Sequence, residues 1–220
     1  IKSFVKRRGH ISRAQERAVE EGMPKWGIAY SAQTHIDFDK QWGTQGQANW
    51  LEIGFGMGET TAKIAKAHPH VNYLGVEIYT AGVGSLIKKI EEEGIENIRI
   101  ISHDVVDVLR DMIPDASLDK VLLYFPDPWR KARHHKRRLI QAEFVAKLAK
   151  KMKPGGVLHC ATDWENYAHL MHDVLSVAPD WQNVASTPFV PRPDDRPLTK
   201  FENRGLKLGH GVWDLLYRVR

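Results

Sequence analysis

Short hydrophobic runs alternate with amphipathic segments of helical length along most of this 220-residue chain. We expect strands at 50–55, 73–77, 98–102, 120–125 and 157–162. Helices are expected between and after them, near 60–68, 82–93, 105–113, 139–152 and 167–177. A weak strand at 182–186 and a last strand at 212–219 complete the pattern. Repeated alternation of strands and helices predicts an α/β fold with a doubly wound, mostly parallel sheet.

The first 47 residues differ from the rest of the chain. Residues 1–25 are basic and helix-prone, which fits either a solvated surface helix or an arm that binds nucleic acid. Residues 26–47 are rich in Gly, Gln and Asp, so we interpret them as a loop. We therefore expect a basic arm and lead-in at 1–47 and one domain at 48–220. Because the chain begins with Ile1, we also expect further sequence before it.

Composition narrows the class of protein. Hydrophobic residues make up 42% of the chain, enough for a core, and the formal net charge is +5. The single cysteine, Cys160, lies in an apolar run and cannot form a disulfide within the chain. Neither the adjacent His134 and His135 nor the pair His169 and His172 belongs to an ordered ligand set, so no metal is expected. No apolar run is long enough to cross a membrane, and we expect a cytoplasmic protein.

A glycine-rich turn follows the first expected strand. Glu52, Gly54, Gly56 and Gly58 form the pattern E-x-G-x-G-x-G. Glycines between a strand and a helix allow a sharp bend and let a ligand lie against bare main chain. The dinucleotide pattern G-x-G-x-x-G would need a glycine where this chain has Glu59, so a pyrophosphate is not the obvious ligand. Glycines that serve packing alone remain the alternative.

Acidic residues follow four successive expected strands after that turn. Glu77, Asp104, Asp127 and Asp163 should share one edge of the sheet, where ligands of such folds bind. A carboxylate at Glu77 can accept hydrogen bonds from both hydroxyls of a ribose, and Asp104 can accept one from an adenine amino group. Helix capping is the alternative role for Asp104 and Asp163.

This set of residues resembles the Rossmann-like methyltransferases that use S-adenosyl-L-methionine. Further motifs are similar to those of bacterial tRNA (guanine-N7)-methyltransferases. They are Phe-Pro-Asp-Pro-Trp at 125–129, the basic run at 133–138, Ala-Thr-Asp-Trp at 161–164 and Thr-Lys-Phe-Glu at 199–202. The resemblance covers nearly the whole chain. It implies a seven-stranded sheet whose last strand is antiparallel, and methylation of N7 of a guanine in the variable loop of tRNA, forming 7-methylguanosine.

The resemblance also implies roles for individual residues. The expected cofactor-binding residues are Glu52, Gly54, Gly56, Gly58, Glu77, Asp104 and Asp127. Asp127 is in addition the expected catalytic residue. The expected substrate-binding residues are Lys131, Asp163, Thr199, Lys200, Phe201 and Glu202. Six of the nine residues from Arg130 to Arg138 are Lys or Arg. The basic run predicts phosphate contacts, unless it is only a solvated face; the expected RNA-binding residues are Arg133, Lys136, Arg137 and Arg138.

Three other functions remain open from the sequence. The Pro-Asp-Pro-Trp turn resembles the Asn/Asp-Pro-Pro-Tyr turn of amino-methyltransferases, which favours methylation of an exocyclic base amine. Trp129 in that turn offers a stacking face for a base, or packs in the core. A non-catalytic RNA-binding module and a small-molecule methyltransferase are the remaining alternatives. We expect tRNA as the partner, no membrane, no obligate protein partner, and a monomer.

Overall fold

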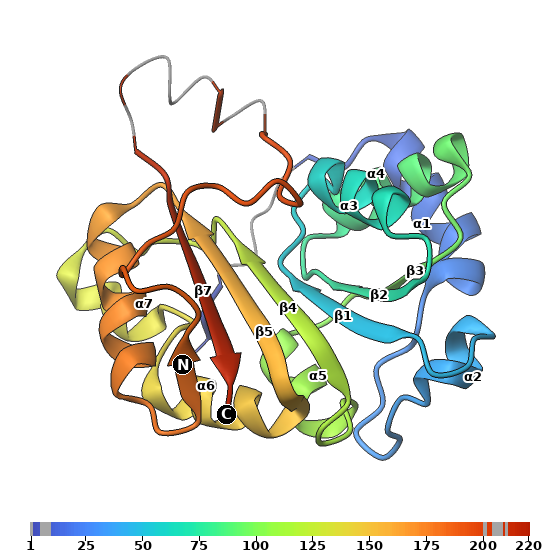
Figure 1. The fold of residues 1–220 in the computed structure, drawn as a ribbon. Helices are drawn as coiled ribbons and strands as arrows, with labels where there is room; N and C mark the ends of the chain where they lie inside the picture. The colour runs from blue at the N-terminus through green and yellow to red at the C-terminus, as the bar shows by residue number, and fades with distance from the viewer. Residues whose placement is uncertain (1, 5–9, 200–201, 204–208, 210) are drawn as a thin grey trace.

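A seven-stranded sheet forms the centre of the computed structural model, which describes residues 2–4, 10–199, 202–203, 209 and 211–220. The strands are Ala48–Ile53 (β1), Val71–Val76 (β2), Ile98–Ile101 (β3), Leu118–Tyr124 (β4), Met152–Thr162 (β5), Trp181–Asn183 (β6) and Trp213–Val219 (β7). Their order across the sheet is β3-β2-β1-β4-β5-β7-β6 (Figure 1). Strands β1 to β5 are parallel, and β7 is antiparallel to β5 and β6. The predicted fold class is therefore confirmed.

Helices pack on both faces of this sheet. They are Arg13–Trp26 (α1), Phe38–Trp42 (α2), Glu59–Ala67 (α3), Thr80–Glu93 (α4), Val105–Asp111 (α5), Ala142–Lys151 (α6) and Glu165–Val177 (α7), with a 3-10 helix at Ala132–Arg137 (η1). In Figure 1, α1, α3 and α4 lie over β1 to β3, and α5, α6 and α7 lie behind the sheet. Helix α1 packs closely on α4, since a Cβ on Gly84 would lie 2.5 Å from the carbonyl oxygen of Gln15. None of the helices in the described ranges is long and apolar enough to span a membrane.

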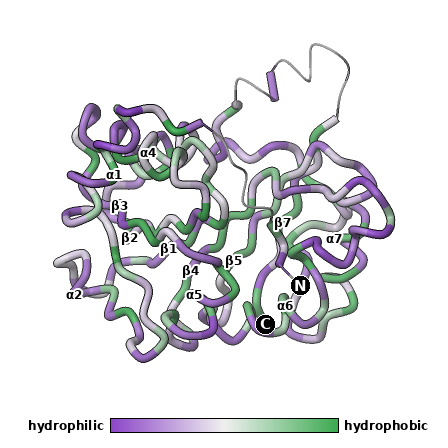
Figure 2. The backbone as a smooth tube through the Cα atoms, turned by 180° about the vertical axis from the view of Figure 1, so that it is seen from behind, coloured by the Kyte–Doolittle hydropathy of each residue, from purple (hydrophilic) through white to green (hydrophobic). Residues whose placement is uncertain are grey.

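Two hydrophobic cores lie on opposite faces of the sheet. Leu74 and Val121 belong to the core under α5, α6 and α7, whereas Tyr73 and Leu122 belong to the core under α1, α3 and α4. Side chains that are adjacent along a strand point to opposite faces, so strands buried on both faces are apolar at most positions. This explains the continuous hydrophobic runs, which Figure 2 shows as green stretches of the central strands.

Short helices form in residues 26–47, which were expected to be a loop, and in the basic run. Within residues 26–47, α2 forms because Asp37 accepts a hydrogen bond from the Lys40 amide (3.1 Å) and Phe38 is buried in the core. The second is η1, within the basic run. Strand β6 is also shorter than expected and begins at Trp181. These elements depend on contacts with the rest of the fold, which a local hydrophobic pattern does not report.

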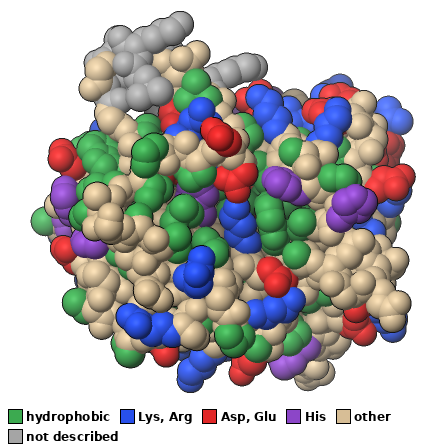
Figure 3. Space-filling model, viewed as in Figure 1, with side chains coloured by type: hydrophobic (Ala, Val, Ile, Leu, Met, Phe, Trp, Pro, Cys, Tyr) green, Lys and Arg blue, Asp and Glu red, His purple; other side chains and the backbone are tan. Residues whose placement is uncertain are grey.

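The two halves of the sheet are covered differently on the face seen in Figure 1. Helices α1, α3 and α4 cover β1 to β3. The segment before β7 is the stretch 184–212, and its described residues lie over β4, β5 and β7. Val190 pairs with Asp214 as an isolated bridge, and Asp195 bonds to Lys120 of β4. Figure 3 shows charged and histidine side chains mixed with hydrophobic ones in the middle of this face.

Candidate functional site

The glycine-rich turn between β1 and α3 leaves bare main chain at the carboxyl end of the sheet. Gly54 and Gly56 have φ values of +70° and +57°, which side-chain-bearing residues rarely adopt. A Cβ at either position would meet no described atom within 4 Å, so this side of the turn is open. On its other side the turn touches α4, since a Cβ on Gly82 would lie 2.1 Å from the Gly56 carbonyl oxygen.

A cleft of about 610 Å³ opens beside this turn. Its walls come from the carboxyl ends of β1, β2, β3 and β4 and from the N-terminal residues Ser3, Phe4 and Ile11. Five of the residues expected to bind the cofactor line it: Gly54, Gly56, Glu77, Asp104 and Asp127. Clefts of this volume suit ligands the size of a nucleoside conjugate.

Glu77 ties the end of β2 to the glycine turn. Its Oε2 accepts a hydrogen bond from the Gly56 amide (2.8 Å). Its Oε1 accepts from the amides of Ile78 (2.7 Å) and Tyr79 (2.9 Å). The carboxylate is therefore held in one orientation at the cleft wall, and Oε2, which accepts only one of these three hydrogen bonds, keeps lone-pair capacity for a hydroxyl donor.

Two of the residues predicted to bind the cofactor, Glu52 and Gly58, are not among the residues that line the cleft, and their role stays a prediction. Glu52 is only 3% exposed and accepts a hydrogen bond from the Tyr73 hydroxyl (2.6 Å). Burial raises the pKa of Glu52 to about 7. Gly58 lies against α4, where a Cβ would come within 2.7 Å of the Leu86 Cβ. Both residues support the turn from inside the fold.

Asp104 caps a helix and also lies at the cleft, where its role in cofactor binding stays a prediction. It precedes α5 and caps it, accepting a hydrogen bond from the Val106 amide (3.0 Å), and it also lines the cleft. Asp163 is different, because α7 begins after Trp164 without a side-chain cap. The capping interpretation is therefore wrong for Asp163, whose side chain is exposed beyond the end of β5.

The turn after β4 is strained and anchored at several points. Phe125 and Trp129 have φ values of +51° and +46°, in a region that costs free energy for residues other than glycine. The Phe125 amide donates to the Ala161 carbonyl (2.7 Å), and the Trp129 indole donates to the Ser3 carbonyl (3.0 Å). Between them, Asp127 is exposed at the cleft. Anchoring at both ends limits the positions that its carboxylate can adopt.

The basic run divides into an exposed part and a buried residue. Lys131, Arg133 and Lys136 are exposed, and the Arg137 guanidinium lies 5.0 Å from the centre of the Trp129 ring. Arg138 is only 3% exposed. It donates to the Pro128 carbonyl (2.8 Å) and to the Asn166 side chain (2.8 Å). Arg138 thus holds the turn after β4 against α7, and its role as a phosphate contact stays a prediction.

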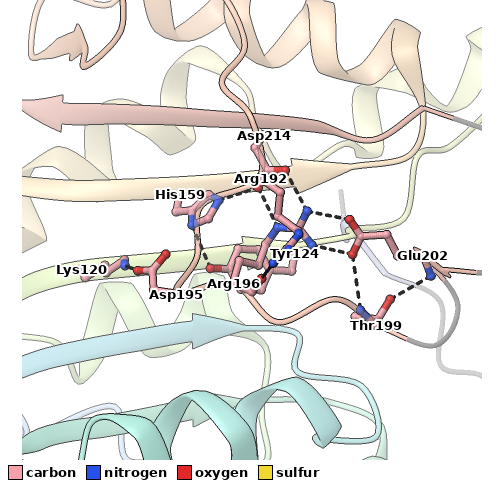
Figure 4. Close-up of polar contacts among 9 residues, drawn as sticks. All are labelled: Lys120, Tyr124, His159, Arg192, Asp195, Arg196, Thr199, Glu202 and Asp214. Atoms are coloured by element: carbon pink, nitrogen blue, oxygen red, sulfur yellow. Dashed lines mark hydrogen bonds and ion pairs between the residues drawn. The ribbon is translucent and has the colours of Figure 1, made fainter. Parts of the chain in front are cut away.

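The Thr-Lys-Phe-Glu motif is described at its first and last residues, and Lys200 and Phe201 lie outside the described residues. Thr199 Oγ1 accepts a hydrogen bond from the Glu202 amide (2.9 Å). The Glu202 carboxylate is buried and receives two hydrogen bonds of 2.7 Å from Arg196 (Figure 4). Glu202 is thus the ion-pair partner of Arg196, and its role as a substrate contact stays a prediction.

Comparisons with known proteins agree with this geometry. The sequence model of a family described as "Putative methyltransferase" matches residues 46–215. A tRNA (guanine-N(7)-)-methyltransferase of Dechloromonas aromatica is 58% identical over all of this chain and 88% of its own length. One from Methylobacillus flagellatus is 56% identical over 99% of this chain and 91% of its own.

The chain belongs to the tRNA (guanine-N7)-methyltransferase family. Solved structures show the same fold at low identity. A 16S rRNA (adenine(1408)-N(1))-methyltransferase from Catenulisporales acidiphilia is 20% identical, with a TM-score of 0.56 over 83% of this chain and 90% of its own. The 16S rRNA methyltransferase KamB is 14% identical, with a TM-score of 0.62 over 85% of this chain and 95% of its own.

Sequence reasoning missed the buried polar residues around Arg196 in this family member. His159 of β5 and Asp214 of β7 lie 2.7 Å apart, and the Tyr124 hydroxyl lies 2.9 Å from the other ring nitrogen of His159. A signal for them was present in the sequence. His159 and Asp214 interrupt strands that are otherwise mostly hydrophobic, and buried charges require partners.

Proposed function

We propose that this chain transfers the methyl group of S-adenosyl-L-methionine to N7 of a guanine in the variable loop of tRNA, forming 7-methylguanosine. The observation that carries the proposal is the position of Asp127. It lies in the same cleft as the glycine turn, Glu77 and Asp104, and only a few residues before the basic helix η1. One turn thus joins a nucleoside-sized cleft to a surface suited to RNA.

The residues of the cleft fit the cofactor. Gly54 and Gly56 offer bare main chain, Glu77 offers a carboxylate oxygen for a ribose hydroxyl, and Asp104 offers an acceptor for an adenine amino group. When bound, S-adenosyl-L-methionine supplies an electrophilic methyl group on a sulfonium. These residues, at the ends of β1, β2 and β3, would hold the nucleoside part of the cofactor.

Asp127 and Asp163 are the residues that we assign to the guanine. N7 of guanine carries a lone pair and no proton, so the protein needs no general base to create a nucleophile. Its task is to align the base, and alignment alone can supply about 7–11 kcal/mol. The guanine becomes positively charged as it accepts the methyl group. A carboxylate near its N1/N2 edge, from Asp127 or Asp163, stabilises that charge.

We assign phosphate binding to the cations beside this turn. They are Lys131, Arg133, Lys136 and Arg137, which present positive charge next to the cleft. Partial burial, together with the neighbouring arginines, lowers the pKa of His134. Contacts of this kind position an RNA without reading its sequence. A tRNA substrate places the proposed reaction in the cytoplasm, and we expect a monomer to carry it out.

The atom that accepts the methyl group provides the test. Unmodified tRNA transcripts would be incubated with the protein and S-adenosyl-L-methionine, digested, and their nucleosides identified by chromatography and mass spectrometry against standards. We expect 7-methylguanosine. A transcript made with 7-deazaguanosine, which has C–H in place of N7, should bind with little change in affinity and accept no methyl. Normal methylation of the deaza transcript would contradict the proposal and favour an exocyclic amine as the target.

A further inference from the structure

Arg196 is a fully buried arginine in the segment before β7 and has two carboxylate partners (Figure 4). Its Nη1 and Nη2 donate to the two oxygens of Glu202, each at 2.7 Å. Its Nε and Nη2 donate to the two oxygens of Asp214 at 2.7 and 2.8 Å. One planar guanidinium therefore joins Glu202, which ends the Thr-Lys-Phe-Glu motif, to Asp214, the second residue of β7.

The Asp214 side of this arrangement is rigid. Burial lowers the pKa of His159, so its ring is neutral near pH 7. Burial opposes the ionisation of Asp214, but hydrogen bonds from His159 and Arg196 lower its pKa overall. Because an ionised carboxylate only accepts hydrogen bonds, His159 donates through Nε2 to Asp214 and accepts from the Tyr124 hydroxyl through Nδ1. Three strands of the sheet thus hold Asp214 in one orientation.

The guanidinium also lies beside the turn that carries Asp127. It is 5.6 Å from the centre of the Phe125 ring and 5.9 Å from that of Tyr124. Phe125 is the strained first residue of the turn. Arg196 therefore contacts one residue of each of two motifs that are distant in sequence: Phe125 of the turn at 125–129 and Glu202 of the motif at 199–202.

We infer that Arg196 is a positioning residue for methyl transfer, which joins Glu202 to Asp214 and so fixes Glu202, and Thr199 bonded to it, relative to the turn at Phe125. Arg196 acts through these neighbours and does not itself need to touch the guanine or the cofactor. The inference rests on the proposed function and extends it. Removing the guanidinium would leave two buried carboxylates facing each other, and Glu202 would have to turn toward water.

The experiment compares Arg196→Met and Arg196→Lys with the unmodified protein below their melting transitions. We expect kcat for tRNA methylation to fall about a hundredfold in Arg196→Met, the loss typical of a misplacement of about 1 Å. The affinities for tRNA and S-adenosyl-L-methionine should change little, because neither ligand is proposed to contact Arg196. Arg196→Lys keeps the charge but can bond well to only one of the two carboxylates. Its kcat should therefore lie between those of the unmodified protein and Arg196→Met.

A second readout does not depend on turnover. The amides of Glu202 and Asn203 bond to Thr199, at 2.9 Å each. Their hydrogen exchange should accelerate in Arg196→Met and less so in Arg196→Lys. Unchanged exchange together with unchanged kcat in a folded Arg196→Met protein would overturn the inference. If Arg196→Met does not fold, Arg196→Lys and Glu202→Gln carry the same test.

Lys120→Met is the matched control, because Lys120 anchors the same segment through Asp195 without touching Glu202. It should keep kcat near that of the unmodified protein. An equal loss of kcat in Lys120→Met would show that any anchor of the segment matters and would refute a specific role for Arg196.

The double variant Arg196→Lys/Glu202→Gln should be no slower than the slower single variant, and multiplied losses would likewise count against the inference. Failure of the unmodified protein to methylate guanine would instead refute the proposed function.

Discussion

The two halves of the sheet build their parts of the site in different ways. The half that we assign to the cofactor, β1 to β3 with α3 and α4, relies on main chain and on its contacts with a carboxylate, such as the Gly56 amide with Glu77. The half that we assign to the substrate, β4 to β7 with the segment before β7, relies on pairs of side chains, which include pairs far apart in sequence. His159 and Asp214 are 55 residues apart, and Trp129 and Ser3 are 126 apart.

This difference has an energetic consequence. A ligand surface made of main chain and one carboxylate tolerates the loss of single contacts, each worth about 1–3 kcal/mol. A buried cluster such as Arg196, Glu202 and Asp214 is stable only when every charge has its partners, since each unpaired buried charge is strongly unfavourable. Changes in the cofactor half should therefore appear as graded losses of cofactor affinity, and changes in the substrate half as losses of turnover or of folding.

Asp127 joins the two halves, and its loss should have the largest effect. Asp127→Ala should lower kcat by a factor of about 10²–10³, the range for removal of one preorganised electrostatic contact. The melting transition should stay in place, because Asp127 is exposed. Steady-state kinetics and thermal unfolding would check both expectations, with the exposed Asp194→Ala as a control. A fully active Asp127→Ala protein would remove Asp127 from the mechanism and direct attention to Asp163→Ala.

Glu77 tests the cofactor half alone. Glu77→Ala should weaken S-adenosyl-L-methionine binding by about 1.5–3 kcal/mol for each charge-assisted hydrogen bond that is lost, or roughly tenfold to a hundredfold. Affinity for tRNA should change little, because the Glu77 carboxylate lies at the end of β2 in the cleft. Calorimetry with each ligand would measure the two affinities. Unchanged cofactor affinity in a folded variant would contradict the assignment of Glu77.

Glu52 gives the cofactor half a pH dependence of stability. Its pKa is about 7 in the folded protein, because of burial, against 4.5 for an exposed glutamate. Between these pH values the unfolded chain loses a proton that the folded protein keeps, so the contribution of Glu52 to stability falls by about 3 kcal/mol as the pH rises from 4.5 to 7. Glu52→Gln lacks this titration and should gain stability relative to the unmodified protein over that window. Denaturant unfolding at several pH values would measure the difference, and parallel curves would contradict the buried state of Glu52.

The basic run should affect binding and its salt dependence more than chemistry. Replacing Arg133, Lys136 and Arg137 with Gln should lower the log–log salt slope of tRNA binding by about 2–3 units, if each neutralises one phosphate. The exposed Lys88→Gln on α4 is the control and should leave the slope unchanged. Binding titrations at several salt concentrations would show this. An unchanged slope in the triple variant would mean that the run is only a solvated surface.

Local sequence patterns determined the cofactor half of this protein. Strand and helix periodicity predicted the sheet, and glycines and acids at strand ends placed Gly54, Gly56, Glu77, Asp104 and Asp127 at one edge, where they line the cleft. This succeeded because parallel strands all end at the same edge, so position along each strand is enough to predict proximity. The antiparallel direction of β7 came only from resemblance to a family, since hydrophobic spacing carries no direction.

Tertiary structure alone decided which charged residues face the solvent. Arg138 stands in a basic run and Glu202 in a substrate motif, yet both are buried and bonded to residues that no local pattern connects with them. Glu52 lies two residues before the open main chain of the turn but points to Tyr73 inside the core. Pairing across the fold depends on which strands become neighbours and on which face each side chain lies. Arg196 meets Asp214 of β7 only because the segment before β7 lies over the half of the sheet that α1, α3 and α4 do not cover.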